Sequence, residues 1–316
     1  MISGEFQLIA KIERLAGKPP ADVFVGIGDD AAIVRSPGEK LVLTVDSQIE
    51  GIHFKRKLSK PEDIGWKALA VNLSDIAAMG GTPRYALVSV GLNKKLDDAF
   101  VLGVYRGILK LAKRHAVVVV GGNISRTDGP FFVDITLIGS IGKSVLSRSG
   151  AKSGDLIAVT GDLGGAAAGL ACLKRGKRNR ASRRHVRPEP RVGIGSALGD
   201  SGLITSMIDV SDGLASELHH LSRQSHVGFR ILADQIPIHR DTRFAGKALK
   251  TDPLDWALYG GEDYELLFTF PVKNANAIRK LGIPYTVIGS ATGKRVELAR
   301  AGKSRKLPAR GWDHFV

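Results

Sequence analysis

The chain has 316 residues, with 46 lysines and arginines against 31 aspartates and glutamates, which gives a formal net charge of +15. Its length exceeds that at which a single hydrophobic core stops growing, so we expect two domains. The single cysteine, Cys172, excludes a disulfide or a thiolate metal site within one chain, and no segment reaches the ~18 apolar residues of a membrane helix.

The N-terminal segment mixes apolar and charged residues and lacks the long apolar stretch of a signal peptide. We therefore expect a cytoplasmic protein that binds no membrane. A short helix at 3–16 and strands at 31–35 and 41–45 are predicted to open the fold.

A long helix is predicted at 61–79. Pro61 suits its first turn, Gly80 and Gly81 end it, and apolar residues recur along it at helical spacing. Strands at 84–91, 116–120 and 131–141, with an amphipathic helix at 97–115, complete one layered α/β unit.

The glycine-, serine- and lysine-rich segment 142–154 is the best domain boundary, and we divide the chain into domains 1–147 and 148–316. The second domain is also predicted to be α/β. Its predicted helices lie at 164–173, near 190, at 211–225 and at 273–281, and its predicted strands at 155–159, 205–210, 227–232, 264–270 and 285–288.

Acidic residues gather at five places despite the positive net charge. Grouped carboxylates raise one another's pKa unless a cation lies between them, and hard oxygen ligands favour Mg²⁺ or Ca²⁺. The pattern predicts a metal-dependent site built from Asp29 and Asp30, Asp46, Asp75, Asp209 and Asp212, and Glu262 and Asp263.

Several of these acids follow glycines or the ends of predicted strands, where rigid elements meet loops. Asp46 ends one strand, and Asp209 with Asp212 joins a strand to a helix, where Ser211 or Asp212 could also serve as a helix cap. Gly122 and Asn123 follow another strand. A plain turn remains the alternative for each motif taken alone.

The segment 174–191 holds nine lysines and arginines and one acid, without an interleaved aromatic residue. A basic cluster of this kind attracts polyanions, but base stacking has no support here. We favour a solvated surface loop over a nucleic-acid contact.

Taken in order, several motifs resemble the thiamine-monophosphate kinase family nearly end to end. They are Gly28-Asp29-Asp30-Ala31-Ala32, Thr44-Val45-Asp46, Glu50-Gly51-Ile52-His53-Phe54, Gly65-Trp66-Lys67-Ala68-Leu69-Ala70-Val71-Asn72-Leu73-Ser74-Asp75, Arg148-Ser149-Gly150-Ala151, Asp209-Val210-Ser211-Asp212-Gly213-Leu214, Gly260-Gly261-Glu262-Asp263-Tyr264-Glu265-Leu266-Leu267-Phe268 and Gly311-Trp312-Asp313-His314-Phe315. The resemblance implies a two-domain α/β fold like that of aminoimidazole ribonucleotide synthetase, in a homodimer joined through the N-terminal sheets.

The resemblance also implies roles for individual residues. Magnesium ions would be held by Asp30, Thr44, Val45, Asp46, Asp75, Asn123, Asp209 and Asp212. ATP would contact Tyr105, Gly122, Asn123, Arg148 and Ser211, and the thiamine moiety would contact His53, Glu262 and Trp312. Two positions depart from the family pattern: Val45 replaces a frequent hydroxyl residue, so its carbonyl would be the ligand, and Asn123 replaces a frequent aspartate.

The implied reaction transfers the γ-phosphoryl group of ATP to thiamine monophosphate, which yields thiamine diphosphate and ADP. A phosphate monoester is already ionised at neutral pH, so no residue is expected to act as a general base. The alternatives are a sister ATP-dependent enzyme of the same fold, making aminoimidazole ribonucleotide or selenophosphate, and a basic polyanion-binding protein.

Overall fold

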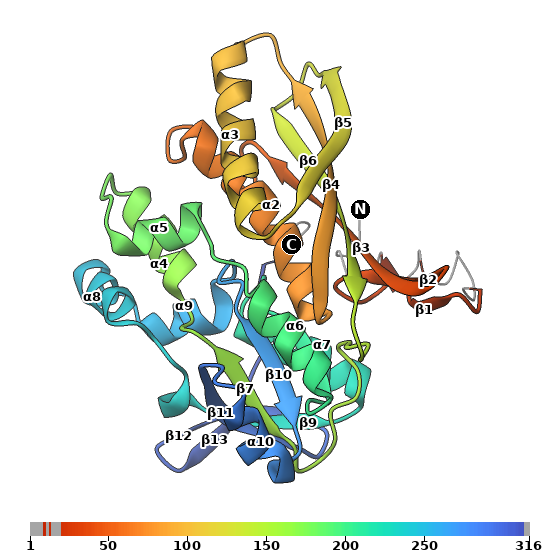
Figure 1. Ribbon diagram of the computed structural model, residues 1–316. Helices are drawn as coiled ribbons and strands as arrows, with labels where there is room; N and C mark the ends of the chain where they lie inside the picture. The colour runs from red at the N-terminus through yellow and green to blue at the C-terminus, as the bar shows by residue number, and fades with distance from the viewer. Residues whose placement is uncertain (1–8, 11–12, 14–19, 313–316) are drawn as a thin grey trace.

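The computed structural model describes residues 9, 10, 13 and 20–312, and it contains two mixed β-sheets flanked by helices (Figure 1). Most of the helix predicted at 3–16, and residues 313–315 of the C-terminal motif, lie outside the described residues. Among the helices in the described part, none has the length and apolar content needed to cross a membrane.

The first sheet has six strands in the order β1-β2-β3-β6-β4-β5. Its neighbouring strands are antiparallel except for β4 and β5, which are parallel. The strands are β1 (Val23–Val25), β2 (Ala32–Ser36), β3 (Glu39–Ile49), β4 (Gly81–Leu92), β5 (Val118–Arg126) and β6 (Phe132–Ile141).

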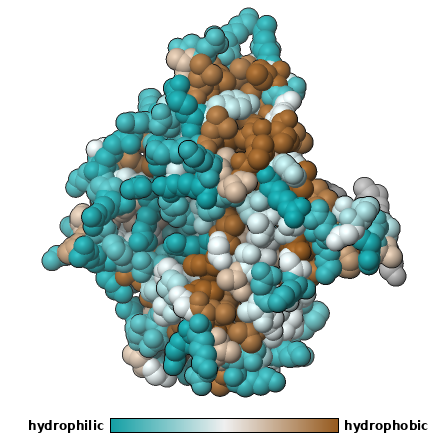
Figure 2. Space-filling model, viewed as in Figure 1, coloured by the Kyte–Doolittle hydropathy of each residue, from teal (hydrophilic) through white to brown (hydrophobic). Residues whose placement is uncertain are grey.

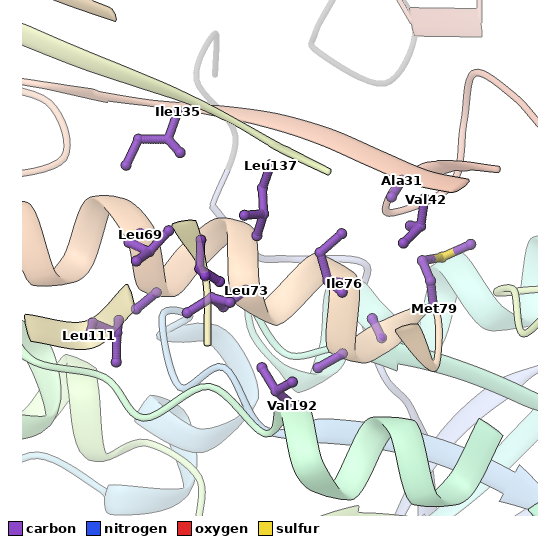
Figure 3. Packing of buried hydrophobic residues seen from close by; sticks show 14 of the residues in the cluster. Ala31, Val42, Leu69, Leu73, Ile76, Met79, Leu111, Ile135, Leu137 and Val192 are labelled. Atoms are coloured by element: carbon purple, nitrogen blue, oxygen red, sulfur yellow. The ribbon is translucent and has the colours of Figure 1, made fainter. Parts of the chain in front are cut away.

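Helices α2 (Pro61–Ala78) and α3 (Asp98–Arg114) cover one face of this sheet. The alternation along β6 explains why, because Val133, Ile135 and Leu137 are fully buried beneath the helices while the residues between them are not. Figure 3 shows α2 between Ile135 and Leu137 of β6 on one side and Val192 of α6 on the other.

The second sheet has seven strands in the order β13-β12-β9-β11-β7-β10-β8. The strands are β7 (Leu156–Thr160), β8 (Ser206–Asp209), β9 (Gly228–Leu232), β10 (Leu266–Phe270), β11 (Tyr285–Thr292), β12 (Val296–Arg300) and β13 (Lys303–Lys306). The helices of this half are α4 (Gly165–Leu173), α5 (Arg180–Val186), α6 (Val192–Ser201), α7 (Leu214–Ser225), α8 (Arg240–Leu249), α9 (Pro253–Tyr259) and α10 (Ala275–Lys280).

One hydrophobic cluster runs from α2 and the first sheet into β10 of the second sheet, where it includes Phe268 and Phe270. The segment between β6 and β7 joins the two sheets and contains the boundary placed at residue 147. The exact boundary at residue 147 stays a prediction.

The structure corrects several details of the sequence-based predictions. Asp46 lies within β3, which continues to Ile49, and Gly122 and Asn123 lie within β5 rather than after it. Helix α7 begins at Leu214, after Gly213 with φ of +111°, so Ser211 and Asp212 precede the helix and neither caps it. Part of the basic segment 174–191 is helical, because Asn179 and Ser182 form a reciprocal capping box at the start of α5.

Candidate functional site

Seven of the eight predicted acids line one cavity of about 620 Å³. The exception is Asp263, whose carboxylate accepts hydrogen bonds from the backbone N–H groups of Gly164 and Ala166 at the start of α4 and does not line the cavity. The walls of the cavity come from both halves of the chain. The first half contributes the loop before β2, β3, the loop after β3 and α2, and the second half contributes the segment between β6 and β7, α4, α5, the end of β8 and the loop before β10. Twelve residues with predicted roles line it: Asp30, Thr44, Val45, Asp46, His53, Asp75, Arg148, Asp209, Ser211, Asp212, Glu262 and Trp312.

Carboxylate oxygens of Asp30, Asp75 and Asp209 lie within 4.8 Å of one another. Each comes from a different element, and the Oδ2 atom of Asp30 is buried without a hydrogen-bond partner among the described residues. An oxygen-only set of carboxylates with an unsatisfied buried oxygen fits a hard divalent cation such as Mg²⁺.

The electrostatics of this cluster also favour a cation. Burial, followed by repulsion from Asp46 and Asp209, raises the pKa of Asp75 well above its usual range. Burial and repulsion from Asp30 likewise raise the pKa of Asp209 to about 8. The only hydroxyl donors recorded to these two carboxylates in the described structure are Thr44 Oγ1 to Asp75 and Ser74 Oγ to Asp209, each at 2.5 Å, and they do not offset the repulsion.

Arg148 lies at one end of the acidic cluster. Its guanidinium pairs with Asp30, and its backbone N–H donates to Oδ2 of Asp29 at 3.1 Å. Although burial would lower the pKa of Arg148, these two carboxylates raise it, so the side chain remains a cation. A planar guanidinium at this edge of the cavity is suited to a forked contact with a phosphate group.

The residues predicted to contact thiamine also line the cavity. The Nδ1 atom of His53 accepts a hydrogen bond from the backbone N–H of Ile49 at 3.0 Å, which leaves Nε2 to carry the proton of a neutral ring. Trp312 is 52% exposed, and its backbone N–H donates to the carbonyl oxygen of Asp212 at 3.2 Å. An exposed indole is suited to contact with a cationic aromatic ring.

Three predicted residues are not among the described residues that line the cavity: Tyr105 on α3, and Gly122 and Asn123 on β5. The strand order explains the separation. Strands β6 and β4 lie between β3 and β5, so three spacings of ~4.8 Å, or ~14 Å in all, separate β5 from the cavity wall. Within one chain, the structure does not bring these three residues to the site.

Comparison with known proteins places this geometry in a family. Models of AIR synthase related proteins match residues 28–141 (N-terminal domain) and 152–300 (C-terminal domain). The chain is 39% identical over 312 residues to the thiamine-monophosphate kinase of Bacillus subtilis strain 168, covering 93% of this chain and 94% of that protein. It is 37% identical over 335 residues to the same enzyme of Escherichia coli K12, covering 100% and 99%.

The chain belongs to the thiamine-monophosphate kinase family. Solved structures agree. The structure of AaThiL complexed with AMPPCP and TMP has a TM-score of 0.88 and 34% identity, covering 99% of this chain and 97% of that one. The thiamine-monophosphate kinase of Stenotrophomonas maltophilia K279a has a TM-score of 0.77 and 34% identity, covering 95% and 98%. The predicted two-domain α/β fold of the aminoimidazole-ribonucleotide-synthetase type is therefore confirmed at the level of two mixed sheets.

Sequence reasoning gave no role to two residues that contact Glu262, Lys67 and His185. Lys67 lies within a quoted family motif, where its buried position could not be distinguished from an exposed helical lysine. His185 lies in the basic segment that we predicted to be a surface loop, although its side chain is 5% exposed.

Proposed function

We infer that this chain is a thiamine-monophosphate kinase that transfers the γ-phosphoryl group of ATP directly to thiamine monophosphate. The observation that carries the inference is the convergence of carboxylates from distant segments on one cavity in a chain of this family. Both substrates are anions, so the main obstacle to the reaction is their mutual repulsion.

We propose that Asp30, Asp46, Asp75, Asp209 and Asp212, with Thr44 and the carbonyl of Val45, hold Mg²⁺ in this cavity. When bound, Mg²⁺ would neutralise the phosphate groups and stabilise the charge that develops on the transferred phosphoryl group. Arg148 and Ser211 would orient the ATP phosphates, Arg148 from the side of the cavity where it meets Asp30.

At the acceptor end, His53, Glu262 and Trp312 would hold the thiamine moiety. The hydrogen bond from Ile49 occupies Nδ1 of His53, so we propose that its Nε2–H donates to the substrate and that the ring does not act as a base. The carboxylate of Glu262 and the indole of Trp312 would face the positive thiazolium ring, and the indole contact would contribute ~0.5–2 kcal/mol.

We further propose that the enzyme is a homodimer that forms through the face of the first sheet opposite α2 and α3, which we call the open face. The open face carries Val45, Tyr85, Leu87 and Val118, which are 62%, 47%, 42% and 54% exposed. Figure 2 shows hydrophobic surface beside α3, over β4, β5 and β6. A second copy of the open face would cover these apolar side chains.

Such a dimer would also account for the predicted residues on β5. Strand register places Asn123 on the open face together with Ser47, through Ser89 and Asp134. If the two-fold axis runs along the strands between β6 and β4, β5 of each chain lies over β3 of the other. Gly122 and Asn123 would then reach the cavity of the neighbouring chain, whereas the role of Tyr105 stays a prediction.

The activity is tested by incubating the purified protein with ATP, thiamine monophosphate and Mg²⁺, followed by mass spectrometry of the products. We expect thiamine diphosphate and ADP, with no product when EDTA replaces Mg²⁺. A panel containing the substrates of aminoimidazole-ribonucleotide and selenophosphate synthesis tests the sister enzymes. Folded protein that makes no thiamine diphosphate would refute the inference.

The shared site is tested by mixing two inactive variants, Asp75→Asn and Asn123→Ala. In a heterodimer, one cavity would combine an intact Asp75 with an intact Asn123 from the other chain. Random exchange makes half of the dimers heterodimers with one complete site each, so the mixture should recover about a quarter of the wild-type activity. No recovery after verified subunit exchange would show that each chain builds its site alone.

A further inference from the structure

Lys67 connects two of the three residues proposed to contact thiamine, His53 and Glu262. Among the described residues it is the one buried lysine, with 3% of its surface exposed. Its Nζ atom donates to Oε1 of Glu262 and lies 3.5 Å from the carbonyl oxygen of His53. Lys67 does not itself line the cavity, so it contacts Glu262 and His53 from the protein interior.

His185 lies beside the other oxygen of the same carboxylate and also lines the cavity. Its Nδ1 atom lies 2.9 Å from Oε2 of Glu262 without hydrogen-bond geometry, and its side chain is 5% exposed on α5. Burial and the positive charge of Lys67 lower the pKa of His185, so the ring is neutral at physiological pH. Glu262 is therefore bonded by Lys67 of α2 on one side and contacted by His185 of α5 on the other.

The loop that carries Glu262 requires such support. Gly261, Glu262 and Tyr264 have φ of +64°, +60° and +51°, and residues other than glycine adopt this region only when their surroundings impose it. Backbone hydrogen bonds from Glu262 to Ser211 at 2.6 Å and from Tyr264 to Val210 at 2.9 Å fix the loop below. Lys67 and His185 contact the side chain above it.

We propose that Lys67 and His185 are positioning residues that set the geometry of the thiamine end of the cavity through Glu262 and the His53 carbonyl. This proposal rests on the proposed function. The charges of Lys67 and Glu262 cancel as a pair, so recognition of the cationic thiazolium depends on where the carboxylate points. Removal of Lys67 leaves the carboxylate unpaired and the loop less constrained, and thiamine monophosphate should then bind more weakly.

The test compares Lys67→Met and His185→Gln with the wild type in steady-state kinetics and in calorimetric binding of thiamine monophosphate without ATP. We expect the KM and the Kd for thiamine monophosphate to rise about tenfold in Lys67→Met, and less in His185→Gln, while the KM for ATP changes less than about twofold. In a double-mutant cycle with Glu262→Gln, the variant Lys67→Met/Glu262→Gln should bind thiamine monophosphate no more weakly than Glu262→Gln alone. Both changes remove the same contact between Lys67 and Glu262.

Asp63→Asn is the matched control. Asp63 lies on the same helix, is buried, and pairs with Nε of Arg187 at 2.5 Å, directly after α5, but neither residue lines the cavity. This variant should unfold at a lower temperature and keep the wild-type Kd for thiamine monophosphate. The comparison separates loss of an ion pair between α2 and the region of α5 from loss of the geometry at Glu262.

The outcomes are distinguishable. A wild type that neither binds nor phosphorylates thiamine monophosphate overturns the proposed function itself. An active wild type, with a folded Lys67→Met variant whose Kd is unchanged or tighter, overturns only the positioning role. Equal losses for ATP and thiamine monophosphate would show that Lys67 supports the fold in general, and would also overturn the proposal.

Discussion

His220 on α7 is buried, and its Nδ1 atom lies 3.2 Å from the guanidinium of Arg223. Burial, followed by the positive charges of Arg148 and Arg223, lowers the pKa of the imidazole to about 3 from an ordinary value of 6.5. Between these two values the unfolded chain binds a proton that the folded protein excludes. This histidine should therefore destabilise the fold progressively as the pH falls below 6.5.

We predict that His220→Gln weakens this acid sensitivity. The free energy of unfolding of the wild type should fall between pH 6.5 and 4.5 by at most about 1.4 kcal/mol per pH unit from this group, and the variant should lose that slope. Urea unfolding at several pH values measures it. His226→Asn is the control, because His226 is exposed, and its slope should match that of the wild type.

Asp75→Asn should distinguish the destabilising repulsion within the acidic cluster from the role of the cluster in binding Mg²⁺. Without Mg²⁺, the variant should be at least as stable as the wild type, because one buried repulsive carboxylate becomes neutral. Mg²⁺ at about 100 times its Kd should stabilise the wild type by roughly 2–3 kcal/mol and the variant much less. Thermal unfolding with and without Mg²⁺ measures both effects, with the exposed Asp128→Asn as control. Equal stabilisation of both proteins would remove Asp75 from the proposed metal site.

At this scale the sequence predicted most of the acids that lie together, because grouped carboxylates require a cation between them. It did not predict all of their positions within elements, since Asp46 lies inside β3 rather than at its end. It could not predict Lys67 or His185. Nothing in a lone lysine on a helix or a lone histidine in a basic run shows that its side chain turns inward onto Glu262. That information depends on how α2 and α5 pack.

The packing of α2 on α3 depends on glycines at their contact. A Cβ atom at Gly107 would collide with the carbonyl oxygen of Glu62, and one at Gly65 with that of Val104. Two helices whose backbones approach this closely leave no room for a methyl group. Because Asp75 lies on the same α2, this contact also fixes one wall of the cavity.

Gly107→Ala should therefore destabilise the protein by about 1–3 kcal/mol through overpacking. Gly193→Ala on α6 is the matched control, because a Cβ atom there meets open space, and its effect should be neutral or slightly stabilising. Chemical denaturation of both variants gives the comparison. A destabilised Gly193→Ala and an unaffected Gly107→Ala would contradict the assigned packing.

The buried strands and long helices were predictable, since α3 and β6 show clear helical and strand periodicity and α2 has clear end signals in Pro61 and Gly80. Short elements were not. Helices α8 and α9 and the strands β1, β12 and β13 went unpredicted, and α5 was concealed by its many basic residues. Such elements are stabilised by contacts with neighbouring elements. An example is β13, which pairs with β12 at the edge of the second sheet.

For the molecule as a whole, the proposed dimer predicts how a substitution on the open face changes the oligomeric state. Leu87→Glu places a charge among apolar side chains that a second copy would cover, so the proposed dimer should dissociate into monomers. Light scattering coupled to gel filtration measures the mass. Phe244→Glu is the control, because Phe244 is 69% exposed on α8, far along the chain from that sheet. A dimeric Leu87→Glu, or a monomeric wild type, would refute the proposed interface.

The two sheets were predictable from the order of elements, but the seam between them was not, because the shared cluster around Phe268 joins segments far apart in sequence. That seam has an evolutionary consequence. Asp75 belongs to one half and Asp209 to the other. If the gene were split between them, each product would retain most of one sheet, but neither would hold the complete set of carboxylates. The two halves are therefore useful only when they are inherited together.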